Sequence, residues 1–240
     1  MEFTKQYPII RYEDGREEPS ADEVLAECAL SVRINGRLTE VLHCIPEYLE
    51  EMLLGRLYTS GAISSPEDIT DLNIHPSLCR ADIKIRETDR TMVRLPDSHI
   101  CPNDILMLSQ RLLDASELFR KTGNVHSVML CRDSEVLYLT EDLDRGRAFE
   151  KTVGRALKDH VDFAGTSVYT TGRIPLPIAQ KAIWAGIPVI VSRSAPTDLT
   201  LELAAAYNLT VIGFARRNRM NIYRAARNGS SAPSPVRPDM

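Results

Sequence analysis

Residues 166–223, TSVYTTGRIPLPIAQKAIWAGIPVIVSRSAPTDLTLELAAAYNLTVIGFARRNRMNIY, are the stretch that decides the fold. Short runs of β-branched and apolar residues at 167–171, 188–192 and 210–214 alternate with helix-like segments at 177–185 and 198–207. Strands that are joined by helical crossovers lie parallel in one sheet. The stretch therefore predicts an α/β fold built on a parallel sheet.

Arginines and hydroxyl side chains follow each of these strands. The three strand ends run into Thr171-Gly172-Arg173, Ser192-Arg193-Ser194 and the segment 214–219, Phe-Ala-Arg-Arg-Asn-Arg. Ligands of open parallel sheets bind beyond the carboxyl ends of the strands, and guanidinium groups suit phosphate oxygens. The pattern predicts a site for a phosphate-bearing anion. The alternative for residues 214–219 is a solvated face, but they follow a buried strand directly, and this favours a site.

Composition indicates an ordinary globular protein. The chain has 240 residues, 43% of them hydrophobic and 26% charged, with a formal charge of −4, so nothing attracts it globally to nucleic acid. No apolar run is long enough to cross a bilayer, and residues 1–18 lack the apolar core of a signal peptide. We expect a cytoplasmic protein with no membrane partner. Its five cysteines include no Cys-x-x-Cys pair, so we expect them to be reduced and mostly buried.

The first part of the chain predicts a flexible arm over residues 1–22 and a small α+β domain over residues 23–100. In that domain, strands at 26–34 and 38–44 flank an Asn35-Gly36 turn, and a helix from Pro46 ends at Gly61. A short helical turn at 65–69 and strands at 72–74 and 81–86 complete the domain.

The second part predicts the larger α/β domain over residues 101–227, after a boundary at 96–102. A long amphipathic helix is expected at 103–120, a hairpin with strands at 126–131 and 136–140, and a helix at 148–159. Residues 228–240 are rich in glycine, serine and proline and predict a disordered tail.

His126 is a candidate site residue at the start of a predicted strand. A lone histidine is more often half-buried and bonded to backbone groups than catalytic. A zinc deaminase would need a glutamate two residues further on and a later Pro-Cys-x-x-Cys, but residue 128 is Val and no cysteine follows Cys131. We therefore expect no zinc and no other metal.

Two further features leave their alternatives open. Glu141-Asp142 with Asp144 and Arg145 fits either a metal-linked acid cluster or a solvated loop that caps the next helix. Cys101 precedes a long helix whose dipole favours the thiolate, so it is either a reactive thiol or, more commonly, a buried inert one.

Several motifs together resemble the FdhD family of formate dehydrogenase accessory sulfurtransferases. The similarity runs from about Glu27 to Tyr223. Its strongest blocks are Ala185-Gly186-Ile187-Pro188-Val189-Ile190, Ser194-Ala195-Pro196-Thr197 and Gly213-Phe214-Ala215-Arg216, continuing through Arg219 and Asn221; further blocks are Thr171-Gly172-Arg173-Ile174 with Lys181, Glu141-Asp142 with Arg145, Ala148 and Lys151, and Thr122-Gly123 with His126.

This resemblance implies a cytidine-deaminase-like layered α/β domain without zinc, a smaller N-terminal α+β domain and a homodimer. It implies a protein that takes persulfide sulfur from a cysteine desulfurase and passes it to the bis(molybdopterin guanine dinucleotide) molybdenum cofactor of formate dehydrogenase, with GDP as a mimic of that ligand. The implied catalytic residue is Cys101. The predicted cofactor-binding residues are His126, Arg173, Ser194, Thr197, Phe214, Ala215, Arg216, Arg217, Asn218 and Arg219.

The chain departs from the family pattern at three places. The family's Cys-x-x-Cys aligns with Ser98-His99-Ile100-Cys101, its Gly-Arg-His-Asn aligns with residues 144–147 and so places Gly146 in the motif, and Pro177 replaces an acidic residue. Serine cannot hold a persulfide. A cofactor-binding or nucleotide-binding chaperone that has lost sulfur transfer is therefore the alternative function, and a nucleotide-sensing module unrelated to molybdenum is the third.

Overall fold

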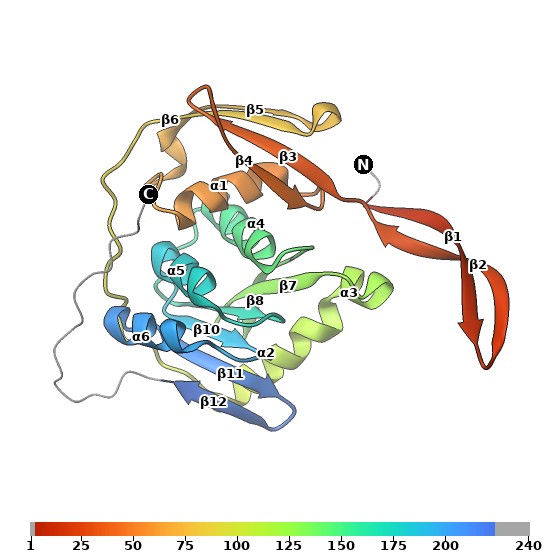
Figure 1. Ribbon diagram of the computed structural model, residues 1–240. Helices are drawn as coiled ribbons and strands as arrows, with labels where there is room; N and C mark the ends of the chain where they lie inside the picture. Colours follow the sequence, from red (N-terminus) through yellow and green to blue (C-terminus); the bar gives the residue numbers. More distant parts are fainter. Residues whose placement is uncertain (1–2, 224–240) are drawn as a thin grey trace.

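The computed structural model describes residues 3–223, and in them the largest element is a six-stranded sheet (Figure 1). Strands β9, β10 and β11 are parallel and are joined through the crossover helices α5 (Leu176–Ala185) and α6 (Asp198–Tyr207). The α/β fold predicted from residues 166–223 is confirmed. The order across the sheet is β12 (Arg219–Tyr223), β11 (Thr210–Arg216), β10 (Val189–Ser192), β9 (Thr166–Thr170), β7 (His126–Arg132) and β8 (Glu135–Asp142).

Helices cover both faces of this sheet. Successive side chains of a strand point to opposite faces, so Val168 and Ile190 belong to the apolar cluster under α4 (Arg145–Lys158) and α5, whereas Tyr169 and Val191 belong to the cluster under α2 (Pro102–Ala115). Figure 1 shows the resulting layers, with α4 and α5 on one side of the sheet and α2 on the other.

A second sheet lies beyond α1 (Leu49–Thr59), which packs on α4. Its β3–β4 hairpin turns at Asn35-Gly36, where both residues have positive φ, as the sequence predicts. A single apolar cluster contains residues of this sheet and of the six-stranded sheet, so the two predicted units share one core. The sheet order is β4 (Arg37–Cys44), β3 (Cys28–Ile34), β6 (Arg80–Ile85) and β5 (Ile69–His75), with short 3₁₀ helices at Pro66–Asp68 and Pro76–Leu78.

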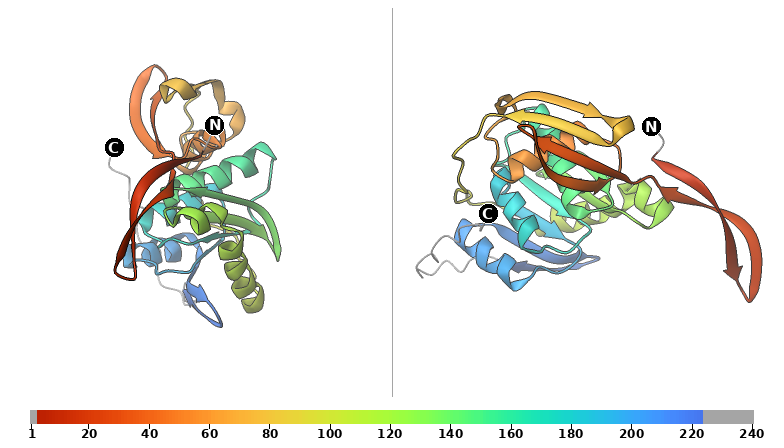
Figure 2. Two further views of the ribbon diagram at one scale, coloured as in Figure 1. Left: turned by 90° about the vertical axis from the view of Figure 1, so that its right-hand side faces the viewer. Right: turned by 45° about the horizontal axis from the view of Figure 1, so that its top comes forward.

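The segment predicted as a flexible arm over residues 1–22 contains paired strands. Strands β1 (Thr4–Glu13) and β2 (Arg16–Leu25) form a regular antiparallel hairpin. Asp14 and Gly15 have φ of 51° and 81°, which is the two-residue turn whose twist matches paired strands. The hairpin stands away from the rest of the molecule (Figures 1 and 2). The predicted tail at 228–240 lies outside the described residues.

The single long helix predicted at 103–120 is also wrong, because it is two helices. Helix α2 ends at Ala115, Ser116 has φ −78° and ψ 86°, and α3 (Glu117–Thr122) begins after it. The Ser116 hydroxyl donates to the Leu112 carbonyl oxygen at 2.6 Å, so this side chain gives a hydrogen-bond partner to a carbonyl group in the last turn of α2. The break turns α3 toward the start of β7.

Candidate functional site

Positively charged side chains gather at one edge of the six-stranded sheet. The parallel strands β9, β10 and β11 end there, and the antiparallel strand β7 begins there at His126. We call this edge the rim and define it by the guanidinium groups of Arg145, Arg173, Arg193 and Arg216 together with His126. The loops that follow β9, β10 and β11 are far apart in sequence and therefore meet in space, as the strand order requires.

Hydrogen bonds of the backbone and of the Ser192 hydroxyl join the three strand-end loops. The Ser192 hydroxyl donates to the Gly172 carbonyl oxygen at 2.6 Å and accepts from the Ser194 amide at 2.8 Å. The Phe214 amide donates to the Ser194 carbonyl oxygen at 3.0 Å. Each loop is thus fixed by its neighbour, so the rim is a preformed surface and not three independent loops.

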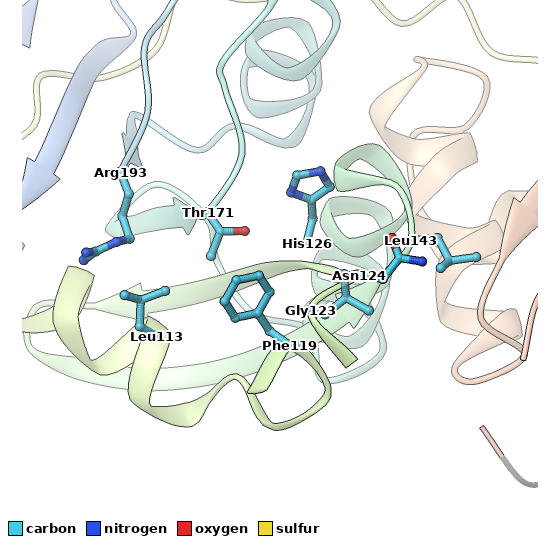
Figure 3. A pocket seen from close by; sticks show the side chains of 9 residues that line it. Leu113, Phe119, Gly123, Asn124, His126, Leu143, Thr171 and Arg193 are labelled. Atoms are coloured by element: carbon cyan, nitrogen blue, oxygen red, sulfur yellow. The ribbon is translucent and has the colours of Figure 1, made fainter. Parts of the chain in front are cut away.

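A cavity of about 320 Å³ opens beside the rim (Figure 3). In Figure 3 the Phe119 ring lies between Leu113 and Asn124, with His126 and Thr171 across from it and Arg193 at one end. Nine residues line the cavity: Leu113, Phe119, Gly123, Asn124, Val125, His126, Leu143, Thr171 and Arg193. Its size is that of a small-molecule site.

The charges of the rim act on one another. Burial lowers the pKa of His126, and the positive charges of Arg145 and Arg173 lower it further against the opposing effect of Asp144. Burial likewise lowers the pKa of Arg193, with Arg216 adding to the effect. Like charges held this close favour an anion that neutralises several of them at once.

The predicted arginine loop at 214–219 is largely ordered as strand. Strand β11 continues to Arg216, the chain turns at Arg217 and Asn218, and β12 returns beside β11. A bulge between Gly213 and Arg216 and a positive φ at Phe214 interrupt the pairing. The sequence prediction missed this hairpin. Its signal is the two-residue turn Arg217-Asn218, followed by the alternating sequence RMNIY of β12. The side chains at 216–219 are exposed.

The predicted ligand residues are only partly brought together at the cavity. His126 lines it, while Arg173, Ser194, Thr197 and residues 214–219 lie on the surrounding loops and not in its wall. Thr197 precedes α6, where its amide donates to the Ile174 carbonyl oxygen at 3.2 Å. The binding roles of all these residues stay predictions.

Cys101 lies at the opposite edge of the sheet. The nearby Ser98 hydroxyl is 3.1 Å from the Thr210 hydroxyl at the first residue of β11. Eight residues further along α2, Ser109 donates to the Ala215 carbonyl oxygen near the other end of β11 and accepts from Arg193. Since a helix rises 1.5 Å per residue, Cys101 is about 12 Å further down the helix than Ser109. The thiol is exposed, and its residue lies at the end of the parallel strands away from the rim.

Burial corrects both alternatives for Glu141 and Asp142. Glu141 accepts hydrogen bonds from the amides of Leu118 and Phe119 at 2.9 and 3.1 Å, and from the Ser127 hydroxyl at 3.1 Å. Asp142 is fully buried and pairs with Lys151 at 2.6 Å. These carboxylates are neither solvated nor in a metal cluster. Between residues 3 and 223, no group of three acidic, histidine or cysteine side chains is placed to hold a metal ion.

Asp144 caps α4, as the second alternative predicted for this segment. Its carboxylate accepts from the amides of Gly146 and Arg147 at 2.8 and 3.2 Å.

Sequence reasoning missed Phe119, Leu113 and Asn124 as cavity residues. Phe119 belongs to the apolar spacing that predicts one helix over 103–120, and the break at Ser116 turns it into the cavity wall; Leu113 lies in the same predicted helix but outside that apolar spacing. Asn124, a polar residue two positions before a strand that begins at the rim, was the one available signal.

The chain matches a known protein family and several relatives over most of its length. The FdhD/NarQ family profile matches residues 25–94 and 87–228. The sulfur carrier protein FdhD of Listeria monocytogenes serovar 1/2a is 28% identical over 254 residues, covering 93% of this chain and 97% of the relative. The protein of the same name from Staphylococcus haemolyticus is 30% identical over 244 residues, covering 90% and 92%.

A solved structure shares the fold. The crystal structure of a protein from Desulfotalea psychrophila, described as a formate dehydrogenase accessory protein, superposes with a TM-score of 0.82 at 25% sequence identity. The match covers 93% of this chain and 98% of the other. Over the described part of the chain, no helix is both long and apolar enough to cross a membrane.

Proposed function

The chain belongs to the FdhD/NarQ family, and from this premise we propose that it is an accessory protein that carries sulfur for the maturation of a formate dehydrogenase or a related molybdoenzyme. Its cargo in this proposal is the bis(molybdopterin guanine dinucleotide) molybdenum cofactor. The protein acts in the cytoplasm as a homodimer, with a cysteine desulfurase as sulfur donor and without zinc, nucleic acid or membrane.

One observation carries the binding half of the proposal: Arg193 and His126 lie in the wall of a cavity of about 320 Å³, and the charges of Arg145, Arg173 and Arg216 act on these two residues. The cargo bears several phosphates, and guanidinium groups bind phosphate oxygens through paired, charge-assisted hydrogen bonds. Arg145, Arg173, Arg193 and Arg216 anchor these phosphates, and the exposed turn at Arg217-Asn218 contacts the rest of the cargo. The low pKa of His126 keeps that imidazole neutral at the cavity wall, where it donates or accepts a hydrogen bond without adding charge.

Titration with GDP tests the binding half. We expect Arg216→Ala to weaken GDP binding about ten-fold, which is the loss typical of a charge-assisted contact to phosphate. Arg37→Ala, which removes an exposed arginine from the β3–β4 turn of the other sheet, serves as the matched control and leaves the affinity unchanged. Equal affinity in the wild type and Arg216→Ala would mean that the rim is not the binding site.

Sulfur transfer in this proposal uses the exposed Cys101 thiol. Its thiolate attacks the outer sulfur of the persulfide on the desulfurase, one S–S bond forms as another breaks, and the desulfurase cysteine leaves as a thiolate. No outside oxidant is needed. Because Cys101 and the rim occupy opposite edges of the sheet, the desulfurase and the cargo approach different faces of the protein.

Mass spectrometry tests this half. After incubation with a cysteine desulfurase and cysteine, the wild type gains the mass of one sulfur atom on the peptide that contains Cys101, and Cys101→Ser does not. An adduct that persists in the Cys101→Ser variant removes this thiol from the mechanism, and Cys79 is then the next thiol to test, because it is the other cysteine that is not buried.

The second candidate function is a cofactor-binding chaperone without sulfur transfer. The observation that favours it is the position of Ser98, whose hydroxyl is bonded to Thr210 and so serves the fold where the family has a cysteine. This candidate predicts GDP binding at the rim together with no sulfur adduct in the same two experiments.

A further inference from the structure

Three cysteines of the four-stranded sheet lie close together. Cys28, the first residue of β3, is the register partner of Cys44, the last residue of β4, and the Cys44 thiol donates to the Cys28 carbonyl oxygen at 3.9 Å. On the other side of β3, the Ser31 amide donates to the Cys79 carbonyl oxygen at 2.8 Å. The Cys79 side chain packs against the apolar cluster that contains the other two cysteines. We call Cys28, Cys44 and Cys79 the thiol cluster.

The members of the thiol cluster differ in their access to solvent. Cys28 is 5% exposed and Cys44 is fully buried. Cys79 is partly exposed, and it follows an exposed turn at residues 75–78. A small oxidant in solution therefore meets Cys79 first, because the oxidation of a thiol requires access to its sulfur.

The backbone of Cys79 does not favour a cysteine. This residue ends the 3₁₀ helix Pro76–Leu78 with φ 44° and ψ 52°, in the left-handed region. Glycine and asparagine adopt this conformation most readily at the end of a helix. The local turn therefore gives no reason for a cysteine at this position, whereas its contact with Cys28 does.

The thiols of the cluster act on one another. Burial raises the pKa of the Cys28 thiol to about 12, and a hydrogen bond with Cys79 and the proximity of Cys44 add to this effect. Burial also raises the pKa of Cys44 to about 12, with the charge of Asp142 adding to it. Both buried cysteines are thus protonated thiols at neutral pH, and the Cys28 and Cys79 side chains are within hydrogen-bonding reach of each other.

The strand order decides which two thiols react together. Strand β3 lies between β4 and β6 in the sheet, so Cys28 lies between Cys44 and Cys79. The Cys44 thiol is engaged with the Cys28 carbonyl oxygen. An oxidised sulfur at Cys79 therefore meets the Cys28 sulfur before that of Cys44.

We propose that Cys79 and Cys28 form a redox-active pair, in which a peroxide oxidises Cys79 and Cys28 then closes a disulfide with it. In the first step the Cys79 sulfur attacks the O–O bond of hydrogen peroxide, which gives a sulfenic acid on Cys79 and one water molecule. In the second step the Cys28 sulfur attacks the Cys79 sulfur, the S–O bond breaks, and the hydroxide leaves as water with the proton of Cys28. The peroxide is reduced, and the two thiols are oxidised to one disulfide.

The thiol cluster is separate from Cys101. Ile45, the neighbour of Cys44, donates its amide to Asp142 at 3.2 Å, and Asp142 is the register partner of His126 at the rim. Cys101 lies at the opposite edge of the six-stranded sheet. The redox pair therefore does not depend on the proposed function, and Cys101→Ser can serve as the background in which it is tested.

Peptide mapping of the full chain tests the proposal. Trypsin cleaves after lysine and arginine, so it leaves Cys28, Cys44 and Cys79 on the separate peptides 17–33, 38–56 and 57–80. After treatment of the Cys101→Ser protein with equimolar hydrogen peroxide and alkylation of the remaining thiols, we expect peptide 17–33 to be linked to peptide 57–80 with the loss of two hydrogen atoms. Dithiothreitol should release the two peptides. Adding Cys79→Ser should abolish the link, whereas adding Cys44→Ala, the matched control, should preserve it.

The intermediate and the folded chain provide two further measurements. In Cys28→Ala the sulfenic acid on Cys79 has no partner, so dimedone should label peptide 57–80. In the wild-type cluster the disulfide closes a loop of about 50 residues, and the midpoint of thermal unfolding should rise by about 5 °C or more and return on reduction. Because Cys79 is partly exposed, Cys79→Ser keeps the test independent of whether Cys28→Ala folds.

Three outcomes overturn the proposal. The first is a peroxide-treated protein without the link between peptides 17–33 and 57–80. The second is a link from peptide 17–33 to peptide 38–56, which would mean that Cys28 pairs with Cys44. The third is a link that forms to the same extent in the native protein and in urea, because the fold would then not direct the pairing.

Discussion

Glu141 shows how one buried carboxylate shapes the cavity. It lies on β8, yet its two oxygens accept from the amides of Leu118 and Phe119 in the first turn of α3, and one of them also accepts from Ser127. The Phe119 side chain, 38% exposed, lines the cavity wall. A residue of the sheet therefore positions a residue of the wall without touching the cavity itself.

Glu141→Gln should lower both the affinity for GDP and the stability of the fold. The amide keeps one acceptor oxygen but replaces the other with donors, so one α3 amide loses its partner and Phe119 is less well fixed. We expect the free energy of unfolding to fall by about 1 kcal/mol, the cost of an unsatisfied buried N–H, and the affinity for GDP to fall about three-fold to ten-fold because the Phe119 wall is less preorganised. Calorimetric titration and thermal unfolding together measure the two effects. The control is Glu117→Gln, an exposed carboxylate in the same turn of α3; a loss of affinity in both variants would contradict a positioning role for Glu141.

His126 gives the rim a titration that nuclear magnetic resonance can follow. Burial and the charges of Arg145 and Arg173 disfavour the imidazolium, so the imidazole should titrate below its ordinary pKa of 6.5 and be neutral at pH 7. A bound polyphosphate neutralises those arginines and should raise the pKa of His126. A midpoint at or above 6.5 in the free protein, or no upward shift with GDP, would contradict this account of the rim.

At the scale of elements, two glycines set the contact between α1 and α4. A Cβ on Gly55 would lie 1.9 Å from the Glu150 carbonyl oxygen, and a Cβ on Gly154 would lie 1.8 Å from the Glu51 carbonyl oxygen. Atoms cannot approach so closely, so both positions require glycine if the helices are to touch backbone to backbone. This contact brings the four-stranded sheet onto the larger one.

Gly154→Ala should therefore separate the two helices. We expect the free energy of unfolding to fall by about 3 kcal/mol, at the upper end of the usual cost of overpacking a core, because backbone rather than a flexible side chain must move. Urea denaturation measures the change. Gly165→Ala, where an added Cβ meets nothing within 4 Å, is the control and should change stability little. Equal effects of the two substitutions would mean that α1 and α4 do not pack this closely.

At the scale of the whole molecule, a buried ionic network joins the two sheets through their helices. Glu150 on α4 is fully buried and is paired with Arg56 of α1 at 3.0 Å, Arg147 at 2.6 Å and Lys181 of α5 at 2.6 Å. Arg56 also bonds Glu40 of β4. Burial opposes the charge of Glu150, but the three cations outweigh it and hold its pKa below the ordinary 4.5.

This network predicts how stability depends on pH. Because the pKa of Glu150 is lower in the folded than in the unfolded chain, its contribution is present above about pH 4.5 and is lost as the pH falls through the folded pKa. Glu150→Gln leaves three cations around a neutral group and should cost about 3–5 kcal/mol at pH 7. Urea denaturation from pH 3 to pH 7 should show a shallower pH dependence in the variant; parallel curves would contradict this role.

Local signals were sufficient to predict the central architecture. The alternation of apolar runs and helix-like segments over 166–223 determined the parallel strands, and the strand order then obliged Arg173, Arg193 and Arg216 to share an edge. Asn35-Gly36 determined its hairpin in the same way. Such features depend on side-chain periodicity and on the residues of turns. Both act over a few residues, so they can be predicted from the sequence.

Other features were decided only by contacts between distant residues. The break at Ser116 and the turn of Phe119 into the cavity depend on Glu141, which lies on another strand. The placement of Cys101 away from the rim depends on the direction in which α2 runs along the sheet. The sequence by itself determined the parallel strands within residues 166–223 and which charges lie at their ends. The tertiary structure alone decided that Cys101 lies away from the rim and that Glu141 and Asp142 are buried. Burial and the direction of a helix are set by packing between distant residues and not by the local sequence.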